Sequence, residues 1–162
     1  MKKSIALVIV ILVSIIFFSA CDRTFKKADK LEPTQIGTVN GLESISMTIK
    51  EGTVSSTGLA VIIKNHSDRE FVYVPIFNME VQIDDMWYQV PVLYDVTYDL
   101  ALSWLSPGDE KELKFDWEYE HGKLGRGKYR VVLYEQMHAI SEDAPVYGGS
   151  DRLILAAEFE IT

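Results

Sequence analysis

The chain has 162 residues, and its 24 acidic and 16 basic residues give a formal net charge of −8 at pH 7. This acidity argues against nucleic-acid binding and against electrostatic attraction to anionic lipid, both of which depend on lysine and arginine. The only cysteine, Cys21, has no disulfide partner within the chain, so any folded domain needs a proper hydrophobic core.

The N-terminus has the pattern of a secretory signal peptide. Lys2 and Lys3 precede an apolar stretch over residues 5–18, and the small residues Ser19 and Ala20 follow it. The alternative is an uncleaved membrane helix, for which the stretch is short because crossing takes about 20 residues. Cleavage after residue 20 would remove two lysines and no acidic residue, which changes the net charge from −8 to −10.

Cys21 adds a second feature to this N-terminus. Phe18-Ser19-Ala20-Cys21 resembles the lipobox of bacterial lipoproteins, although Phe18 stands where an aliphatic residue is usual. The resemblance implies signal cleavage between Ala20 and Cys21, acylation of Cys21 with fatty acids such as palmitate, and a lipid anchor on the extracytoplasmic face of the cell membrane. Each buried methylene contributes about 0.8 kcal/mol, and two acyl chains hold a protein stably. A purely structural role for Cys21 is the alternative.

Residues 21–43 are expected to form the lipidated cysteine and a flexible tether. The segment is polar, mixed in charge and without hydrophobic periodicity, and it contains Pro33, Gly37 and Gly41. Fully extended, it would reach about 70 Å and lift the domain away from the bilayer. Residues 44–162 then have the size of one domain.

Within residues 44–162, apolar and polar residues alternate with the period of a β-strand. In "KELKFDWEYE", one face of a strand is expected to carry the apolar residues Leu113, Phe115, Trp117 and Tyr119. The charged residues between them are expected on the other face. Further strands are predicted in "SISMTIK", "GLAVIIKN", "FVYVP", "NMEVQID", "MWYQVPV", "GKYRVVLY" and "RLILAAEFEIT". Pro107-Gly108 suits a type II turn between two of them. Seven to nine short strands predict an all-β antiparallel sandwich, with a closed barrel as the alternative.

Family features are found in "KNHSDREFVYVPIFNMEVQIDDMWYQVPV", "LSPGDEKELKFDW" and "GKLGRGKYRVV". They contain an Asn-x-Ser-Asp turn, a tryptophan followed by Val-Pro, a Pro-Gly turn before an acidic-aromatic strand, and a Gly-x-Tyr-Arg strand start. With these features, the chain resembles bacterial immunoglobulin-like domains of small lipoproteins of Gram-positive bacteria. The resemblance implies an immunoglobulin-like β-sandwich and no particular activity. A more distant likeness is to the intracellular proteinase inhibitor family.

Three aromatic residues are expected to support the fold. Tyr129 follows Gly127 at the start of a predicted strand, which suits a tyrosine corner whose hydroxyl bonds a nearby backbone group. Trp87 and Trp117 lie on predicted strands and are expected to fill the space between the sheets.

The sequence contains no motif for catalysis, metal binding or a cofactor. His66, His121 and His138 are far apart and form no His-Glu-x-x-His pattern, and the first two are expected in solvated loops. There is no Gly-x-Ser-x-Gly elbow, and "GKLGRGK" lacks the spacing of a phosphate-binding loop. We therefore expect a protein without catalytic residues, metal or cofactor.

One group of carboxylates offers a catalytic alternative. Asp116, Glu118 and Glu120 are expected on one face of one strand, about 7 Å apart, which is near the carboxylate spacing of inverting glycosidases. Alternating acids on an exposed strand face more commonly keep a sheet soluble and protect its edge.

A long connection is the expected binding loop. "EQMHAISEDAPVYGGSD" at residues 135–151 exceeds the usual length of a sandwich connection, and long loops are often functional. Its candidate contact residues are Met137, His138, Val146 and Tyr147.

A second candidate contact surface lies at residues 92–104. Tyr94, Tyr98 and Trp104 could form it, whereas the alternative is an ordinary pair of buried strands.

Together, these features predict a non-catalytic, lipid-anchored binding module at the extracytoplasmic face of the cell membrane. Its expected partners are membrane lipid, through acylated Cys21, and a protein or wall polymer of the cell envelope. The alternatives are an inhibitor of an exported protease and, less in keeping with the sequence, a cell-wall glycan hydrolase.

Overall fold

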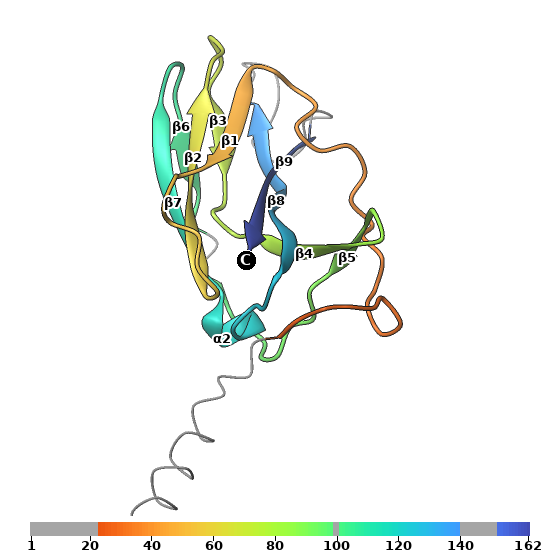
Figure 1. The fold of residues 1–162 in the computed structure, drawn as a ribbon. Coiled ribbons are helices and arrows are strands. Elements are labelled where there is room, and N and C mark those ends of the chain that lie inside the picture. The colour runs from red at the N-terminus through yellow and green to blue at the C-terminus, as the bar shows by residue number, and fades with distance from the viewer. Residues whose placement is uncertain (1–22, 99–100, 140–151) are drawn as a thin grey trace, which may run out of the picture.

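The computed structural model describes residues 23–98, 101–139 and 152–162 (Figure 1). These residues form nine β-strands and one short helix. The strands are β1 (Ile45–Ile49), β2 (Gly58–Asn65), β3 (Phe71–Tyr73), β4 (Asn78–Ile83), β5 (Met86–Gln89), β6 (Ser103–Leu105), β7 (Glu110–Asp116), β8 (Gly127–Ala139) and β9 (Arg152–Ile161), and the helix is α2 (Glu118–His121).

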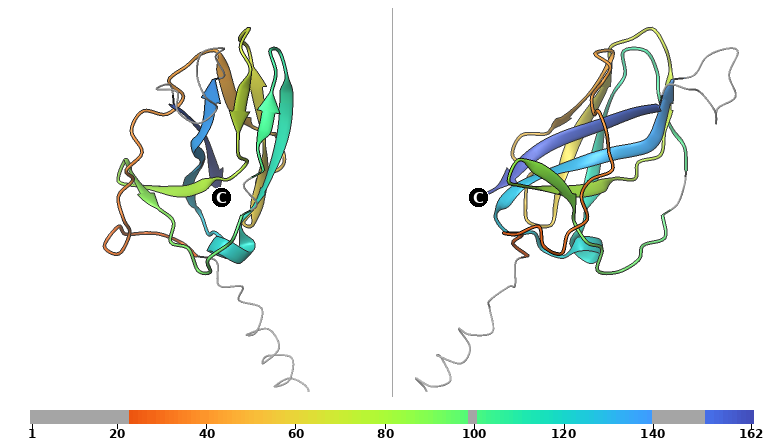
Figure 2. Two further views of the ribbon diagram at one scale, coloured as in Figure 1. Left: turned by 180° about the vertical axis from the view of Figure 1, so that it is seen from behind. Right: turned by 90° about the vertical axis from the view of Figure 1, so that its right-hand side faces the viewer.

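The strands form two antiparallel sheets that pack face to face. One sheet has the order β1-β2-β7, and the other has the order β5-β4-β8-β3-β6, with β9 paired to β8 as well. Figures 1 and 2 show β1, β2 and β7 along one side of the molecule and the pair β8–β9 across from them. The all-β sandwich predicted from the alternating pattern is therefore confirmed.

The core lies between the two sheets. Alternate residues of β2 and β8, such as Val61 and Val131, are fully buried and belong to one hydrophobic cluster with Trp117 and Phe159. Trp117 is 0% exposed, and its indole Nε1 donates a hydrogen bond to the backbone oxygen of Ser56 at 2.9 Å. The prediction that Trp117 fills the space between the sheets is confirmed.

Trp87 has a different environment from the one predicted. It lies on the edge strand β5, is only half-buried, and does not belong to the buried cluster. The guanidinium of Arg130 lies over its ring, 4.4 Å from the centroid, and the ammonium of Lys128 lies 5.7 Å away. An edge strand leaves one side of such a ring open to solvent, so Trp87 stacks with cations instead of filling the core.

Tyr129 forms the tyrosine corner that the sequence predicts. Its hydroxyl donates a hydrogen bond to the backbone oxygen of Gly125 at 2.9 Å, and its side chain is fully buried. Burial raises the pKa of Tyr129 to about 12, so the hydroxyl keeps its proton at physiological pH. The ring stacks on Phe159, with the centroids 5.6 Å apart.

Replacing Tyr129 with phenylalanine is expected to lower the free energy of unfolding by about 1–2 kcal/mol, because it removes a buried hydrogen bond and leaves the Gly125 oxygen without this donor. Urea denaturation measures the change. The matched control is Tyr88→Phe, because the Tyr88 hydroxyl is exposed and forms a weak hydrogen bond to the sulfur of Met86, at 3.9 Å. Equal stabilities of the two variants would contradict the role of the corner.

β7 ends earlier than the alternating pattern predicts. The strand stops at Asp116, and α2 begins two residues later. The Asp116 carboxylate accepts a hydrogen bond from the backbone N–H of Glu118 at 3.0 Å, which turns the chain out of the sheet. Tyr119 is consequently 67% exposed instead of facing the core. The prediction that Asp116, Glu118 and Glu120 share one strand face is therefore wrong, so strand geometry does not set the spacing of these carboxylates.

The segment expected to be a flexible tether packs on the sandwich in the described residues. Its backbone forms isolated bridges, from Arg23 to Leu124 and from Pro33 to Tyr88, and its residues Phe25 and Leu31 pack against the core. Further along, the backbone and side chain of Asn40 bond to β9. Polar composition predicted a free chain because these partners lie far away in the sequence.

Candidate binding site

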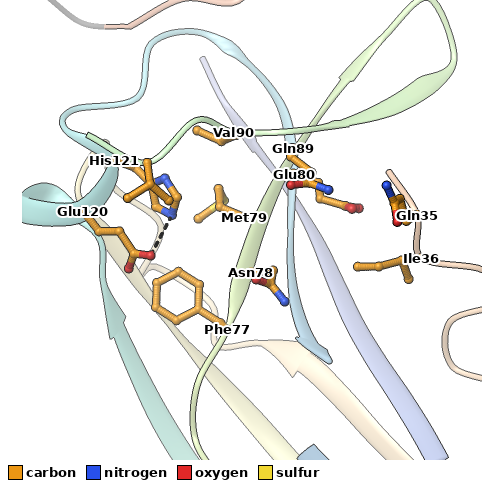
Figure 3. Close-up of a pocket in the computed structure, with 11 residues that line it drawn as sticks. Gln35, Ile36, Phe77, Asn78, Met79, Glu80, Gln89, Val90, Glu120 and His121 are labelled. Carbon is orange, nitrogen blue, oxygen red and sulfur yellow. Dashed lines mark ion pairs between the residues drawn. The ribbon is translucent and has the colours of Figure 1, made fainter. Parts of the chain in front are cut away.

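A pocket of about 300 Å³ opens between the N-terminal segment, β4, the end of β5 and α2 (Figure 3). One half is mainly apolar and includes a histidine and a carboxylate: Phe77, Met79, Val90, Val92, Glu120 and His121. The other half is rich in amide groups: Gln35, Ile36, Asn78, Glu80 and Gln89. Figure 3 shows the labelled residues of these two groups on opposite sides of the pocket.

His121 is the last residue of α2 and is buried, with 3% exposure. Its Nδ1 lies 3.4 Å from the backbone oxygen of Pro91, and its Nε2 lies 3.7 Å from Oε1 of Glu120. Burial lowers the pKa of His121, and the nearby charge of Arg23 acts in the same direction, while Glu120 and the Pro91 oxygen oppose it. The expectation of a solvated loop residue is wrong, because α2 turns this side chain inward.

Glu120 is held between His121 and an aromatic hydroxyl. The hydroxyl of Tyr98 donates a hydrogen bond to Oε2 of Glu120. Burial, together with this bond and the charge of the carboxylate, raises the pKa of Tyr98 far above its ordinary value. Tyr98 therefore remains a hydrogen-bond donor, and Glu120 remains in a fixed position at the pocket wall.

Glu80 forms a buried ion pair at the opposite wall. Its Oε2 accepts a hydrogen bond from Nε of Arg130 at 2.6 Å and lies 2.5 Å from Nη2 in an ion pair, and its Oε1 accepts a hydrogen bond from the Thr34 hydroxyl. Glu80 is 1% exposed and Arg130 is 5% exposed, and the Trp87 ring covers the guanidinium. The carboxylate is therefore neutralised by the guanidinium and held in place by hydrogen bonds to Arg130 and Thr34.

The chemistry of the lining indicates which ligands the pocket could accept. Its described lining includes Glu80, Glu120 and three amide side chains, but neither lysine nor arginine. Because Arg130 already pairs with Glu80, the free negative charge is that of Glu120. The pocket thus favours a neutral polar or positively charged group over an anion. Among the described residues, no serine, threonine or cysteine side chain is hydrogen-bonded to His121.

The unfolding free energy is expected to fall as the pH drops below about 6.5, the ordinary pKa of histidine. The folded-state pKa of His121 is depressed, so the unfolded chain binds a proton first, and His121 favours folding only above that range. Urea denaturation at pH 7.5 and pH 5.5 should show a smaller drop for His121→Asn than for the original chain. His66→Asn, at an exposed position, is the control and should keep the full drop.

The predicted binding-loop residues are divided between a strand and the part of the chain outside the description. Met137 and His138 lie in β8, where their backbones pair with β3 and β9, so the connection begins after Ala139 and not at residue 135. Val146 and Tyr147 lie outside the described residues, as do Ala20 and Cys21.

Two of the three residues of the second predicted contact surface, Tyr94 and Tyr98, contact residues of α2. Tyr94 is 58% exposed and stacks on Tyr119, with centroids 5.1 Å apart, and Tyr98 bonds Glu120. Trp104 instead lies on β6, beside β3. Residues 92–98 form no strand and are mostly exposed, so the alternative of a buried strand pair is wrong.

Sequence reasoning missed the pocket itself. Its lining residues Gln35, Glu80 and His121 come from distant parts of the chain, and no local pattern connects them. No group of three or more histidine, cysteine or acidic side chains suited to a metal gathers within residues 23–98, 101–139 and 152–162. In the same part of the chain, no helix is long and apolar enough to cross a membrane.

Two facing antiparallel sheets, a tyrosine corner and a buried tryptophan define an immunoglobulin-like β-sandwich, a class of domain that generally serves in binding. The chain belongs to the bacterial Ig-like domain family, whose model matches residues 41–144. No curated protein matched the chain in a sequence comparison. The family match ends before β9, and it begins after most of the N-terminal segment that packs on the domain.

Proposed function

We propose that this protein is a lipid-anchored interaction module on the extracytoplasmic face of a bacterial cell membrane, and that it catalyses no reaction. The observation that carries the proposal is the combination of a lipobox-like Phe18-to-Cys21 sequence with an Ig-like domain that follows it in the chain from residue 41. An exported domain of a binding class, placed next to an acylation signal, suits a protein that holds or recruits another envelope component.

The anchor is tested by feeding cells an alkyne-bearing palmitate analogue and then detecting the label on the purified protein. We expect label on the original chain and none on Cys21→Ser, because acylation requires the thiol of the single cysteine. Ser19→Ala, which keeps a small residue before the cleavage point, is the control and should remain labelled. An unlabelled original chain, or a labelled Cys21→Ser variant, would refute the anchor.

The pocket between β4, β5 and α2 is the proposed contact for the envelope partner. Its carboxylate at Glu120 and its amide groups suit a lysine side chain, an amino terminus or an uncharged polar segment. The partner is therefore a protein or a wall polymer that presents such a group. The connection with Val146 and Tyr147 is retained as a second proposed contact.

Photocrosslinking in intact cells tests the pocket. A photoreactive amino acid at Asn78, an exposed lining residue, should capture a recurrent partner, whereas one at Glu51, exposed and away from the lining, should not. Glu120→Gln should weaken capture from Asn78 because it removes the negative charge and keeps the side-chain shape. If a photoreactive residue at Tyr147 captured the partner and one at Asn78 did not, the second proposed contact would be the binding site. Undiminished capture in Glu120→Gln would show that the negative charge of Glu120 does not contribute to partner binding.

A further inference from the structure

The α2 end of the domain carries an exposed apolar surface. Val92, Leu93, Tyr94, Val96 and Tyr119, which we call the α2-end face, are between 36% and 67% exposed. Single exposed apolar residues are common, but a group at one end of a small domain indicates a surface that something covers. The face extends outward from the pocket, since only Val92 lines both.

The α2-end face is held in shape by bonds to the helix. The backbone N–H of Leu93 donates to the backbone oxygen of Glu120 at 2.7 Å, and the rings of Tyr94 and Tyr119 stack at 5.1 Å. The chain from Pro91 onward and the helix therefore present their apolar side chains together, although they are separated by more than twenty residues in the sequence.

The N-terminal segment is bound at the same end. The backbone N–H of Arg23 donates to the oxygen of Lys123 at 2.8 Å, and the N–H of Gly125 donates to the oxygen of Arg23 at 2.7 Å. Nη1 of Arg23 donates to the backbone oxygens of His121 and Pro91 at 2.8 and 3.2 Å. Figure 1 shows the first described residues beside α2.

Arg23 and the α2-end face are direct neighbours. A methyl group built on Gly122 would lie 3.1 Å from Cδ1 of Leu93 and 3.5 Å from Cδ of Arg23, so the two side chains meet above this glycine. Cys21 precedes Arg23 by two residues, and its Cα can be at most about 8 Å from that of Arg23. Lipid attached to Cys21 would therefore bring the bilayer surface to this end of the domain.

We propose that the α2-end face rests on the membrane surface, so that the domain stands directly on the bilayer instead of being held away from it by a tether. The inference rests on the acylation of Cys21 proposed above. A tyrosine side chain combines an apolar ring with a hydroxyl that can stay hydrated, so Tyr94 and Tyr119 suit the headgroup region. The aliphatic side chains of Leu93 and Val96 suit the boundary between headgroups and acyl chains. The contact is apolar, in keeping with the acidic composition of the chain.

This orientation points the other end of the sandwich outward. β2 starts beside Trp117 and runs away from α2 for eight residues, about 26 Å, to the turn that contains Asp68. A second copy of the chain or a wall polymer could also cover an apolar surface. The short link from Cys21 favours lipid, because it keeps the acyl chains close to this surface.

Depth-dependent quenching tests the contact. The full-length protein is purified from membranes with Cys21 acylated, so that Tyr119→Cys or Asp68→Cys carries the only free thiol for a fluorophore. In phosphatidylcholine vesicles with brominated acyl chains, quenching at residue 119 should be at least about twofold stronger than at residue 68. Equal quenching at both positions, or none at either, overturns the contact when mass spectrometry finds diacylglycerol on Cys21. Absence of that mass refutes the anchor itself.

A glycine substitution tests whether the docked segment sets this orientation. A methyl group on Gly125 would lie 3.1 Å from the backbone nitrogen of Thr24, so Gly125→Ala should release the segment and lower quenching at residue 119 to the level at residue 68. Gly37→Ala is the matched control, because nothing lies within 4 Å of its added methyl group. Urea denaturation checks that both variants fold. Unchanged quenching in a folded Gly125→Ala variant would overturn the role of the docked segment.

Discussion

Replacing Arg130 with methionine is expected to lower the free energy of unfolding by about 3–5 kcal/mol, because it leaves the Glu80 carboxylate buried without a counter-charge. Glu80 is 1% exposed and, within the described part of the chain, would keep the Thr34 hydroxyl as its hydrogen-bond partner. Such a loss is a large fraction of the stability of an ordinary domain, which is about 5–15 kcal/mol. Urea denaturation of residues 22–162, followed by circular dichroism, measures it.

Two further variants test whether the loss of stability comes from leaving a charge buried or merely from breaking an ion pair. Lys64→Met breaks an ion pair between another cation and glutamate, Lys64–Glu110 at 3.4 Å, but both side chains are about half exposed, so the loss should stay below about 1 kcal/mol. The double variant Glu80→Met with Arg130→Met should recover much of the loss, since a buried pair replaced by apolar side chains is often neutral. If Arg130→Met costs no more than Lys64→Met, the buried pair is not a determinant of stability.

The strands were predictable because the alternating pattern of each strand lies within a few consecutive residues. β2 and β4 coincide with alternating stretches whose ends carry turn residues, and residues 106–109 form the predicted turn, with Gly108 at φ 78° and a bond from the Asp109 N–H to the Ser106 oxygen. The alternation fails where a single local bond overrides it. At Asp116, one side-chain acceptor ends the strand although the apolar spacing continues through Tyr119.

The pocket and the docked N-terminal segment were not predictable because they depend on pairs distant in the sequence. Glu80 and Arg130 are 50 residues apart, and Arg23 bonds to an oxygen of His121, 98 residues away. Composition could describe residues 21–43 only as polar and aperiodic. Edge strands and helix ends accept such a segment through backbone groups, and these groups are the same in every sequence.

Replacing Trp117 with alanine is expected to cost about 3–5 kcal/mol, the range for a large aromatic side chain removed from a packed core. Its ring is fully buried and stacks on Phe159 at 5.6 Å, with Phe77 edge-on at 6.5 Å, so neighbours on both sides would border a cavity. The Ser56 oxygen would keep one donor, the N–H of Leu124 at 2.9 Å, so the lost hydrogen bond adds little. Chemical denaturation measures the change.

Trp104→Ala is the matched control, because the same substitution at a 43% exposed position on β6 should cost less than about 1 kcal/mol. Trp117→Phe should fall between the two, since it keeps an aromatic ring and loses the bond to Ser56. Similar costs for Trp117→Ala and Trp104→Ala would show that the core does not depend on this ring.

The position of Trp117 links stability to the candidate site. It directly precedes α2, and its backbone oxygen accepts the N–H of His121 at 2.8 Å, so the buried ring fixes where the helix starts. Movement of α2 would displace Glu120 from the pocket and Tyr119 from the α2-end face together. Trp117→Ala should therefore weaken both crosslinking from Asn78 and quenching at residue 119 under conditions where the domain is still folded. Tyr129→Phe, which acts through Gly125, should leave the crosslinking from Asn78 unchanged.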